Sequence, residues 1–256
     1  MSNNIYFTIG KIFFAIATLA IGIVILVTGN FPTGLLPLAA LFSGKIILVY
    51  LSGIAMIVAG IMMLTNKFIP PGALLAAVIW LLFFLLLHLP RLIKTYNSPN
   101  EWTPTFEVAM LFSGALILLS VTDPAKNYRF KLSAVARYIF AIALLVFAIL
   151  HFKYAAFVAT LVTPWIPFHL FWAYFAGLAF LAVAISLVIQ KLMHLSTILL
   201  GLMFFLWFLV LHIPLVIASY QSETQWTSIA VVLAASGISF LFAGWAMCKP
   251  SINSVT

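Results

Sequence analysis

Two histidines near the ends of long apolar segments are the residues of this chain best suited to chemistry. His88 and His212 both lie in the pattern Leu-His-apolar-Pro, at a spacing of 124 residues (212 − 88). A neutral imidazole can ligate a metal ion or a haem, hydrogen-bond a quinone carbonyl, or relay a proton. An ionisable side chain near the end of an apolar span is costly unless it is paired, solvated or used. Each ring could equally cap its own helix end at the level of the lipid headgroups, and the sequence leaves both interpretations open.

The same spacing connects other residues on either side of the two histidines. Downstream it pairs Tyr96 with Tyr220 and Trp102 with Trp226. Upstream it pairs Tyr50 with Tyr174, Gly53 with Gly177 and Lys67 with Lys191. One half of the chain therefore resembles a diverged copy of the other, and the matched polar and aromatic residues gather just after each histidine.

The composition places these residues in a membrane protein. Hydrophobic residues make up 66% of the chain and charged residues only 6%, which leaves too little polar surface to cover a soluble globule. The formal net charge is +8, but the basic residues are scattered singly between apolar segments. They are typical of topology signals and lipid-headgroup contacts. The expected partner is the lipid bilayer, and nucleic acid is not expected.

Several kinds of chemistry are excluded by what the sequence lacks. A single cysteine, Cys248, excludes an intramolecular disulfide and the Cys-x-x-Cys patterns, so redox chemistry would need a bound cofactor. The chain has no phosphate-binding glycine loop, nucleophile elbow or HExxH motif. Two histidines alone are a weak metal signature, because catalytic zinc sites use three protein ligands. No catalytic residue, metal site or enzymatic activity is therefore assigned.

Eight apolar segments are long enough to cross a bilayer core of about 30 Å, so we expect an all-α polytopic fold. The expected spans are 9–28, 45–65, 71–90, 105–122, 134–152, 169–189, 195–214 and 227–247. Pro90 and Pro214 should end or bend their helices just past each histidine, because proline clashes with the preceding turn. The apolar connections on the side of the histidines are expected to lie in the interface or fold back over the bundle.

The internal repeat suggests how the eight helices are organised. We expect two parallel four-helix repeats, at residues 1–122 and 134–256, joined by a polar linker at residues 123–133. Four spans per repeat is an even number, so both halves enter the membrane in the same direction. His88 and His212 should then lie at the same depth.

The distribution of basic residues predicts the orientation. The side that holds the N-terminus carries eight of them: Lys11, Lys67, Lys126, Arg129, Lys131, Arg137, Lys191 and Lys249. The opposite side carries four: Lys45, Arg91, Lys94 and Lys153. The positive-inside rule places both termini in the cytoplasm and both histidines near the outer face. We expect a multi-pass protein of the bacterial inner membrane.

Other residues near the outer face are candidates for a ligand site. Tyr96, Tyr220, Trp102 and Trp226 could line such a site, although they also fit an interfacial aromatic belt. Arg91 follows the first His-Pro pair and has no basic counterpart in the second half. It could receive an anionic headgroup or substrate, or it could snorkel to the interface.

The outer connection of the second half contains three further candidates, His151, Trp165 and His169. The corresponding connection of the first half contains no histidine. A ligand pocket beneath this connection is one interpretation. A roof packed by aromatic side chains is the simpler alternative.

The second half contains the motifs HF at 151–152, LVTPWIP at 161–167 and YFAG at 174–177. With these motifs it resembles the DoxX (DoxX/DoxD) family of small bacterial membrane proteins. The usual member has about four spans, so this chain resembles a fused tandem pair. Members have been tied to membrane oxidoreductase assemblies, including thiosulfate:quinone oxidoreductases, so the resemblance implies quinone as a ligand. In many DoxX-like chains an acidic residue follows the Y-x-x-G motif by three positions, whereas this chain has Met56 and Phe180 there.

The sequence thus leads to one functional hypothesis and two alternatives. The hypothesis is that His88 and His212 bind a lipophilic, quinone-like molecule near the outer face, as part of a membrane redox assembly with an extracytoplasmic or membrane partner. Haem held by both histidines is a less favoured ligand. The first alternative is a non-catalytic scaffold or assembly factor, whose outer loops form the binding surface. A small-molecule transporter ranks last, because the expected spans lack charges at the midplane.

Overall fold

The computed structural model describes residues 4–36, 46–122 and 129–247, and this part of the chain is helical without strands. Eight of its helical segments are long and apolar enough to cross a membrane, which confirms the expected all-α, eight-span architecture. Six spans are single helices: α1 (Ile5–Thr28), α2 (Ile46–Leu64), α5 (Pro99–Thr122), α6 (Arg129–Lys153), α8 (His169–Ile189) and α11 (Glu223–Met247). A short helix, α7 (Ala155–Thr160), precedes α8.

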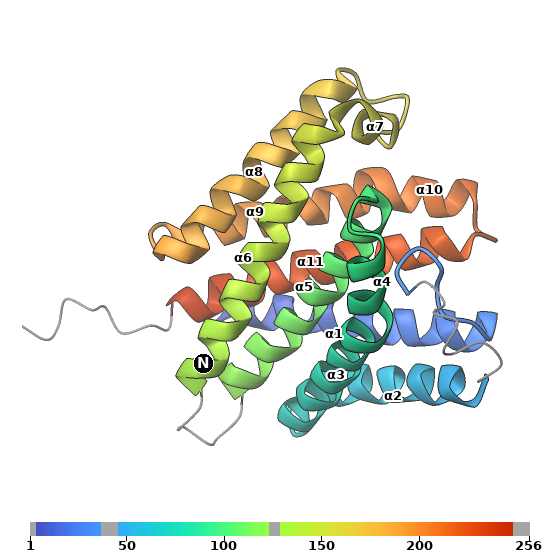
Figure 1. Cartoon of the computed structure of the whole chain (residues 1–256). Coiled ribbons are helices and arrows are strands. Elements are labelled where there is room, and N and C mark those ends of the chain that lie inside the picture. The colour runs from blue at the N-terminus through green and yellow to red at the C-terminus, as the bar shows by residue number, and fades with distance from the viewer. Residues whose placement is uncertain (1–3, 37–45, 123–128, 248–256) are drawn as a thin grey trace, which may run out of the picture.

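The two remaining spans each contain a π-helical turn that ends in a histidine. The third span joins α3 (Ile69–Phe83), η2 (Phe84–His88) and α4 (Leu89–Lys94). The seventh joins α9 (Met193–Trp207), η4 (Phe208–His212) and α10 (Ile213–Ala218). Figure 1 shows α4 and α10 continuing these spans.

Proline explains the wide turns. Pro90 and Pro214 lack an N–H, and their rings would clash with the carbonyl of the residue four positions earlier. A π turn moves the hydrogen bonds to a spacing of five residues, so that Leu89 N donates to the carbonyl oxygen of Phe84. The prediction that proline ends the helices is therefore wrong. Each span continues past the expected boundary, to Lys94 and to Ala218.

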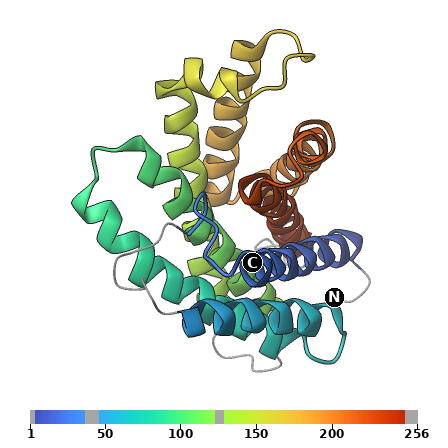
Figure 2. The same cartoon turned by 90° about the vertical axis from the view of Figure 1, so that its right-hand side faces the viewer.

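The long helices pack side by side in a ring. Along the ring, α1 packs against α2 and α11, α3 lies between α2 and α5, and α6 lies between α5 and α8. Helix α9 lies between α8 and α11, and α5 also touches α11 (Figures 1 and 2). The order of contacts is the same within residues 1–122 and 134–256, but the arrangement as two repeats remains a prediction. Most of the expected linker, residues 123–128, lies outside the described residues, and α6 begins at Arg129.

Glycines allow α1 to pack closely against its neighbours. A Cβ atom on Gly10 would lie 2.7 Å from the carbonyl oxygen of Gly237 on α11. A Cβ atom on Gly22 would lie 2.7 Å from the carbonyl oxygen of Gly53 on α2. Small residues at such crossings let backbones approach, which is how helices gain packing energy in lipid. Helix α1 is thereby packed closely against both α2 and α11.

The connection after α1 folds back into the bundle at the end that carries the histidines. Gly29 ends α1 in the left-handed region, with φ 64°. Phe31, Leu35 and Leu36 then bury their side chains completely or nearly so. The expectation that this apolar connection folds back into the protein is confirmed for residues 30–36, whereas residues 37–45 lie outside the described part of the chain.

Candidate functional site

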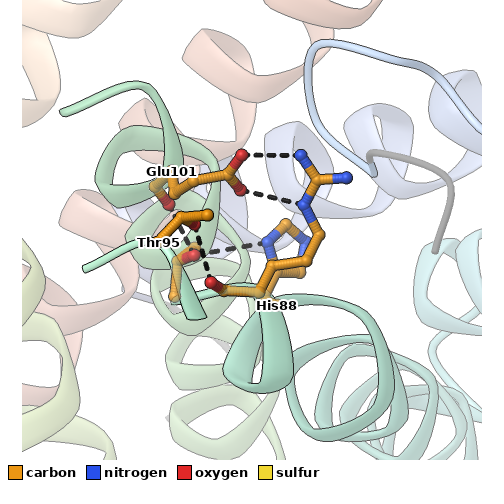
Figure 3. Close-up of polar contacts among 5 residues, drawn as sticks. His88, Thr95 and Glu101 are labelled. Atoms are coloured by element: carbon orange, nitrogen blue, oxygen red, sulfur yellow. Dashed lines mark hydrogen bonds and ion pairs between the residues drawn. The ribbon is translucent and has the colours of Figure 1, made fainter. Parts of the chain in front are cut away.

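His88 is fully buried at the end of the π turn of the third span. Its Nδ1 atom lies 3.4 Å from Oγ1 of Thr105 on α5 (Figure 3). Its Nε2 atom is buried and makes no hydrogen bond. The backbone of Leu35 lies near the same ring, but outside hydrogen-bond geometry with Nε2. A buried polar nitrogen without a partner is uncommon in folded proteins, so His88 calls for an explanation.

An ion pair joins the helices on either side of His88. Arg91 Nε donates to Glu101 Oε2 at 3.0 Å, and Arg91 Nη2 donates to Glu101 Oε1 at 2.6 Å. This two-bonded geometry is the strong form of a guanidinium–carboxylate contact. The side chains are 36% and 13% exposed, respectively, so the pair is only partly screened by solvent. The expected basic patch at Arg91 is one half of this ion pair, which ties α4 to α5.

Hydroxyl groups extend this ion pair into a small network. Thr105 Oγ1 donates to the carbonyl oxygen of Glu101 at 2.6 Å. Thr95 Oγ1 donates to the carbonyl oxygen of Arg91 at 2.7 Å. Figure 3 shows His88, Thr95 and Glu101 converging on this corner. His88 thus lies next to a polar corner formed by Arg91 and Thr95 of its own span and its continuation, and by Glu101 and Thr105 of α5.

The loop of residues 30–36 covers the same corner. Phe31 meets Phe83, five residues before His88, edge-on with ring centroids 5.4 Å apart. With the Leu35 backbone beside the imidazole, the loop closes the site from the end of the bundle. A molecule that reached Nε2 from this end would have to displace the loop.

His212 occupies the same place in the seventh span, but its surroundings differ. Its side chain is only partly buried, and its Nδ1 atom is buried without a hydrogen bond. The positions that correspond to Arg91 and Glu101 hold Leu215 and Gln225. No ion pair therefore forms at this corner.

Glu223, the acidic residue of the second corner, binds a loop residue instead of a neighbouring cation. Glu223 Oε1, at the start of α11, accepts hydrogen bonds from the backbone N and the Oγ1 of Thr33, both at 2.8 Å. Glu223 therefore ties α11 to the outer loop of the first half.

The two histidines do not form a pair. The η2 turn packs against α5 and the η4 turn against α11. No hydrogen bond or ring contact joins the two imidazoles within the described residues. No group of three or more potential metal ligands occurs there either. The structure therefore shows no direct contact between His88 and His212 in its described part.

The repeated tyrosines and tryptophans build two matching turns. Trp102 Nε1 donates to the carbonyl oxygen of Tyr96, and Trp226 Nε1 donates to that of Tyr220, both at 2.8 Å. Tyr96 and Tyr220 are 63% and 68% exposed. These indole contacts fasten the α4–α5 and α10–α11 connections, which explains the repeated spacing by local structure.

The three candidates in the connection between α6 and α8 have different surroundings. His151 Nδ1 contacts the carbonyl oxygen of Phe147 at 2.8 Å, and the ring packs edge-on against Phe180 at 5.1 Å. Phe180 is the residue that stands where many DoxX-like chains have an acidic residue. Trp165 is 63% exposed, and His169 is partly exposed at the start of α8. His151 is therefore a helix-packing residue beneath α8.

Sequence reasoning missed a carboxylate inside α5. Because α5 begins at Pro99 and not at 105, Glu107 is the ninth residue of a 24-residue span. It is partly buried and has no hydrogen-bond or ion-pair partner among the residues that the structure describes. Glu107 is thus an acidic residue within α5, in the half of the helix that follows Pro99. The pattern Ser98-x-x-Glu101, a capping-box signature, could have indicated the earlier start.

Two of the basic residues that predict the orientation, Lys11 and Arg137, also lie inside spans. Lys11 Nζ on α1 donates to Asn66 Oδ1 in the α2–α3 connection at 3.0 Å. Arg137 Nη1 on α6 donates to the carbonyl oxygens of Leu187 and Val188, the latter at 3.2 Å, near the end of α8. Lys11 thus binds a side chain just after α2, whereas Arg137 binds backbone carbonyl groups near the end of α8, where they lack helical partners.

Comparisons with protein families, with curated proteins and with solved structures found no match to this chain.

Proposed function

We propose that this integral membrane protein binds the polar head of a lipophilic small molecule, of the quinol and quinone class, at His88. The observation that carries the proposal is the fully buried Nε2 atom of His88, which has no hydrogen-bond partner. Leaving such an atom unsatisfied costs about 1–3 kcal/mol. A ligand that hydrogen-bonds Nε2 would recover this free energy.

The contacts of His88 indicate whether its ligand should donate or accept a hydrogen bond. Thr105 Oγ1 carries one hydrogen, which it donates to the carbonyl oxygen of Glu101 at 2.6 Å. Towards His88 Nδ1, 3.4 Å away, this hydroxyl can therefore only accept. We therefore assign the proton of the neutral ring to Nδ1, which leaves Nε2 as an acceptor. A hydroxyl group, as in a quinol, complements Nε2 better than a quinone carbonyl does.

The surroundings of the site fit the two parts of such a molecule. The polar corner of Arg91, Glu101 and Thr105 lies on one side of the imidazole, and apolar side chains such as Phe83 and Leu87 lie nearby in the same span. The head group would enter by displacing the loop of residues 30–36. A quinol gives up protons and electrons together, so the redox partner would stand near this end of the bundle.

The cellular setting of the proposal follows from the basic residues and the resemblance to DoxX proteins. We place the chain in a bacterial inner membrane with both termini in the cytoplasm and His88 near the outer face. The chain would be a tandem DoxX-like protein in a membrane redox assembly. A partner in the membrane or outside the cytoplasm would accept the electrons.

Binding of a simple quinol tests the proposal. Duroquinol and duroquinone are titrated anaerobically into the purified protein, and quinones copurifying with it are sought by mass spectrometry of the extracted lipids. We expect duroquinol to bind more tightly, and His88→Phe to weaken its binding by about ten-fold, which corresponds to about 1.4 kcal/mol. His212→Phe is the matched control and should retain binding. Equal losses in both variants, or no binding to the wild type, would refute the proposal.

A scaffold or assembly factor is the second candidate, and one feature favours it. Trp165 and Phe168 project from the connection before α8, with 63% and 80% of their surfaces exposed. Large exposed apolar side chains outside the spans are typical of contact surfaces. If the chain is a scaffold, Trp165→Ser with Phe168→Ser will abolish copurification of one stable partner, and His88→Phe will leave it intact.

A further inference from the structure

A groove on the outside of the bundle runs between α6 and α8. It has a volume of about 360 Å³ and apolar walls. Its floor contains Ala141 and Ala184, which are buried, and its rims include Ile142 and Ile185, which are 52% and 50% exposed. Small residues between large ones thus create a hollow on a surface that faces lipid. The groove is distant in the chain from His88 and lies on different helices.

The sequence of α6 gives the groove a charged end. Lys131, Tyr138 and Leu145 are spaced by seven residues, which places them on one face of the helix. Tyr138 and Leu145 line the groove, and Lys131 lies exposed about 10 Å beyond Tyr138 along the helix. The face of α6 that forms the groove therefore ends in an ammonium group.

Helix α8 brings a second ammonium group to the same end. The groove reaches Ile189, the last residue of α8, and the exposed Lys191 follows two residues later. Arg137 fixes the register of the helices here, because it binds carbonyl groups at the end of α8 while its guanidinium lies 4.3 Å from the ring centroid of Tyr138. Two exposed lysines thus lie at the same end of an apolar groove.

We infer that the α6/α8 groove is a binding site for an anionic phospholipid. The acyl chain lies in the groove between Ile142 and Ile185, and the phosphate contacts Lys131 and Lys191. Each lysine near an anionic headgroup favours binding about five-fold. A zwitterionic lipid would gain the same apolar contacts but less from the lysines. This inference does not depend on any ligand at His88.

Native mass spectrometry of the full-length protein in mild detergent tests the site. Phosphatidylglycerol and phosphatidylcholine are titrated separately. We expect phosphatidylglycerol to bind more tightly, and Lys131→Gln with Lys191→Gln to lower its affinity at least five-fold while affinity for phosphatidylcholine stays unchanged. The charge-matched control, Lys67→Gln with Lys94→Gln, changes two exposed lysines elsewhere and should have little effect. Equal losses in both double variants, or equal binding of the two lipids by the wild type, overturn the inference.

Filling the groove provides an independent test of the acyl-chain position. Ala184→Leu should weaken the binding of both lipids. Ile185→Trp, on the exposed rim, serves the same purpose without altering the buried floor. Leu199→Trp on α9, where the leucine is 57% exposed, is the control for a bulky ring on a lipid-facing surface. Unchanged binding in Ile185→Trp, or the same loss in Leu199→Trp, contradicts the proposed position.

Discussion

The two corners that contain His88 and His212 have the same backbone conformation but differ in their side-chain chemistry. In both, a π turn ends in histidine, proline follows at the second position of the next helix, and an indole fastens the connection to the following span. Only the first corner buries its histidine completely and surrounds it with a polar network. The second leaves His212 partly exposed, beside apolar Leu215.

The acidic residues at the start of α5 and of α11 make different contacts. At the first corner, Glu101 is used within the corner, because it binds Arg91. At the second, Glu223 reaches out to Thr33 and holds the loop that covers His88. The second corner thus supports the first. The first copy of the repeated pattern thus forms the candidate site around His88, and the second copy stabilises the loop that covers it.

Truncating each histidine should give the largest difference between the corners. His88→Ala removes a fully buried side chain, and we expect it to cost about 2–4 kcal/mol of stability, as large-to-small changes in packed cores do. His212→Ala should cost about half as much, because the side chain is partly exposed. Thermal unfolding in detergent micelles measures both. Equal shifts would mean that His212 is packed as tightly as His88.

Introducing the ion pair of Arg91 and Glu101 into the second corner tests whether the two corners differ only in their side chains. Arg91→Leu leaves the partly buried Glu101 without its partner, and we expect a loss of about 1–2 kcal/mol. In the second corner, Leu215→Arg with Gln225→Glu places the same pair at the corresponding positions. A double-mutant cycle from thermal unfolding should give a favourable coupling of about 1 kcal/mol. Zero coupling would show that the two backbones differ more than the π turns indicate.

The sequence predicted much of the fold because the apolar segments are long and the matched residues are distinctive. Eight spans, the helical class and a shared environment for Trp102 and Trp226 follow from hydropathy and spacing alone. Span starts were predicted less well, since α5 and α11 begin at Pro99 and Glu223, upstream of their apolar residues. Polar first turns contribute little to hydropathy, and only the capping pattern marks them.

The candidate site was predicted only in part, for a physical reason. Hydropathy identified His88, but its burial depends on the loop that returns after α1 and brings Leu35 beside the ring. The ion pair of Arg91 and Glu101 forms across a connection whose conformation the sequence does not specify. Whether His88 and His212 meet depends on the packing of η2 and η4 against different helices. These contacts are tertiary, and spacing along the chain carries no information about them.

Thr105 allows a finer comparison, because its counterpart in the second half is Ile229. Thr105→Val removes the hydroxyl that bonds the Glu101 carbonyl and contacts His88 Nδ1. We expect a loss of about 1 kcal/mol, together with a weaker preference for duroquinol over duroquinone, because Nδ1 loses its acceptor. Ile229→Thr should leave duroquinol binding unchanged. A Thr105→Val protein that retains the full preference would exclude the tautomer assigned to His88.

The indole contacts should give the smallest effects, and these should be equal. Trp102→Phe and Trp226→Phe each remove one hydrogen bond of 2.8 Å to a tyrosine carbonyl while keeping an aromatic ring, so each should cost about 0.5–1 kcal/mol in thermal unfolding. Tyr96→Phe is the control, because the acceptor is the backbone carbonyl and not the phenol. Equal shifts would establish that the corners share their turn structure. A much larger shift for Trp102→Phe would place the origin of their difference in the turn rather than in the side chains around His88.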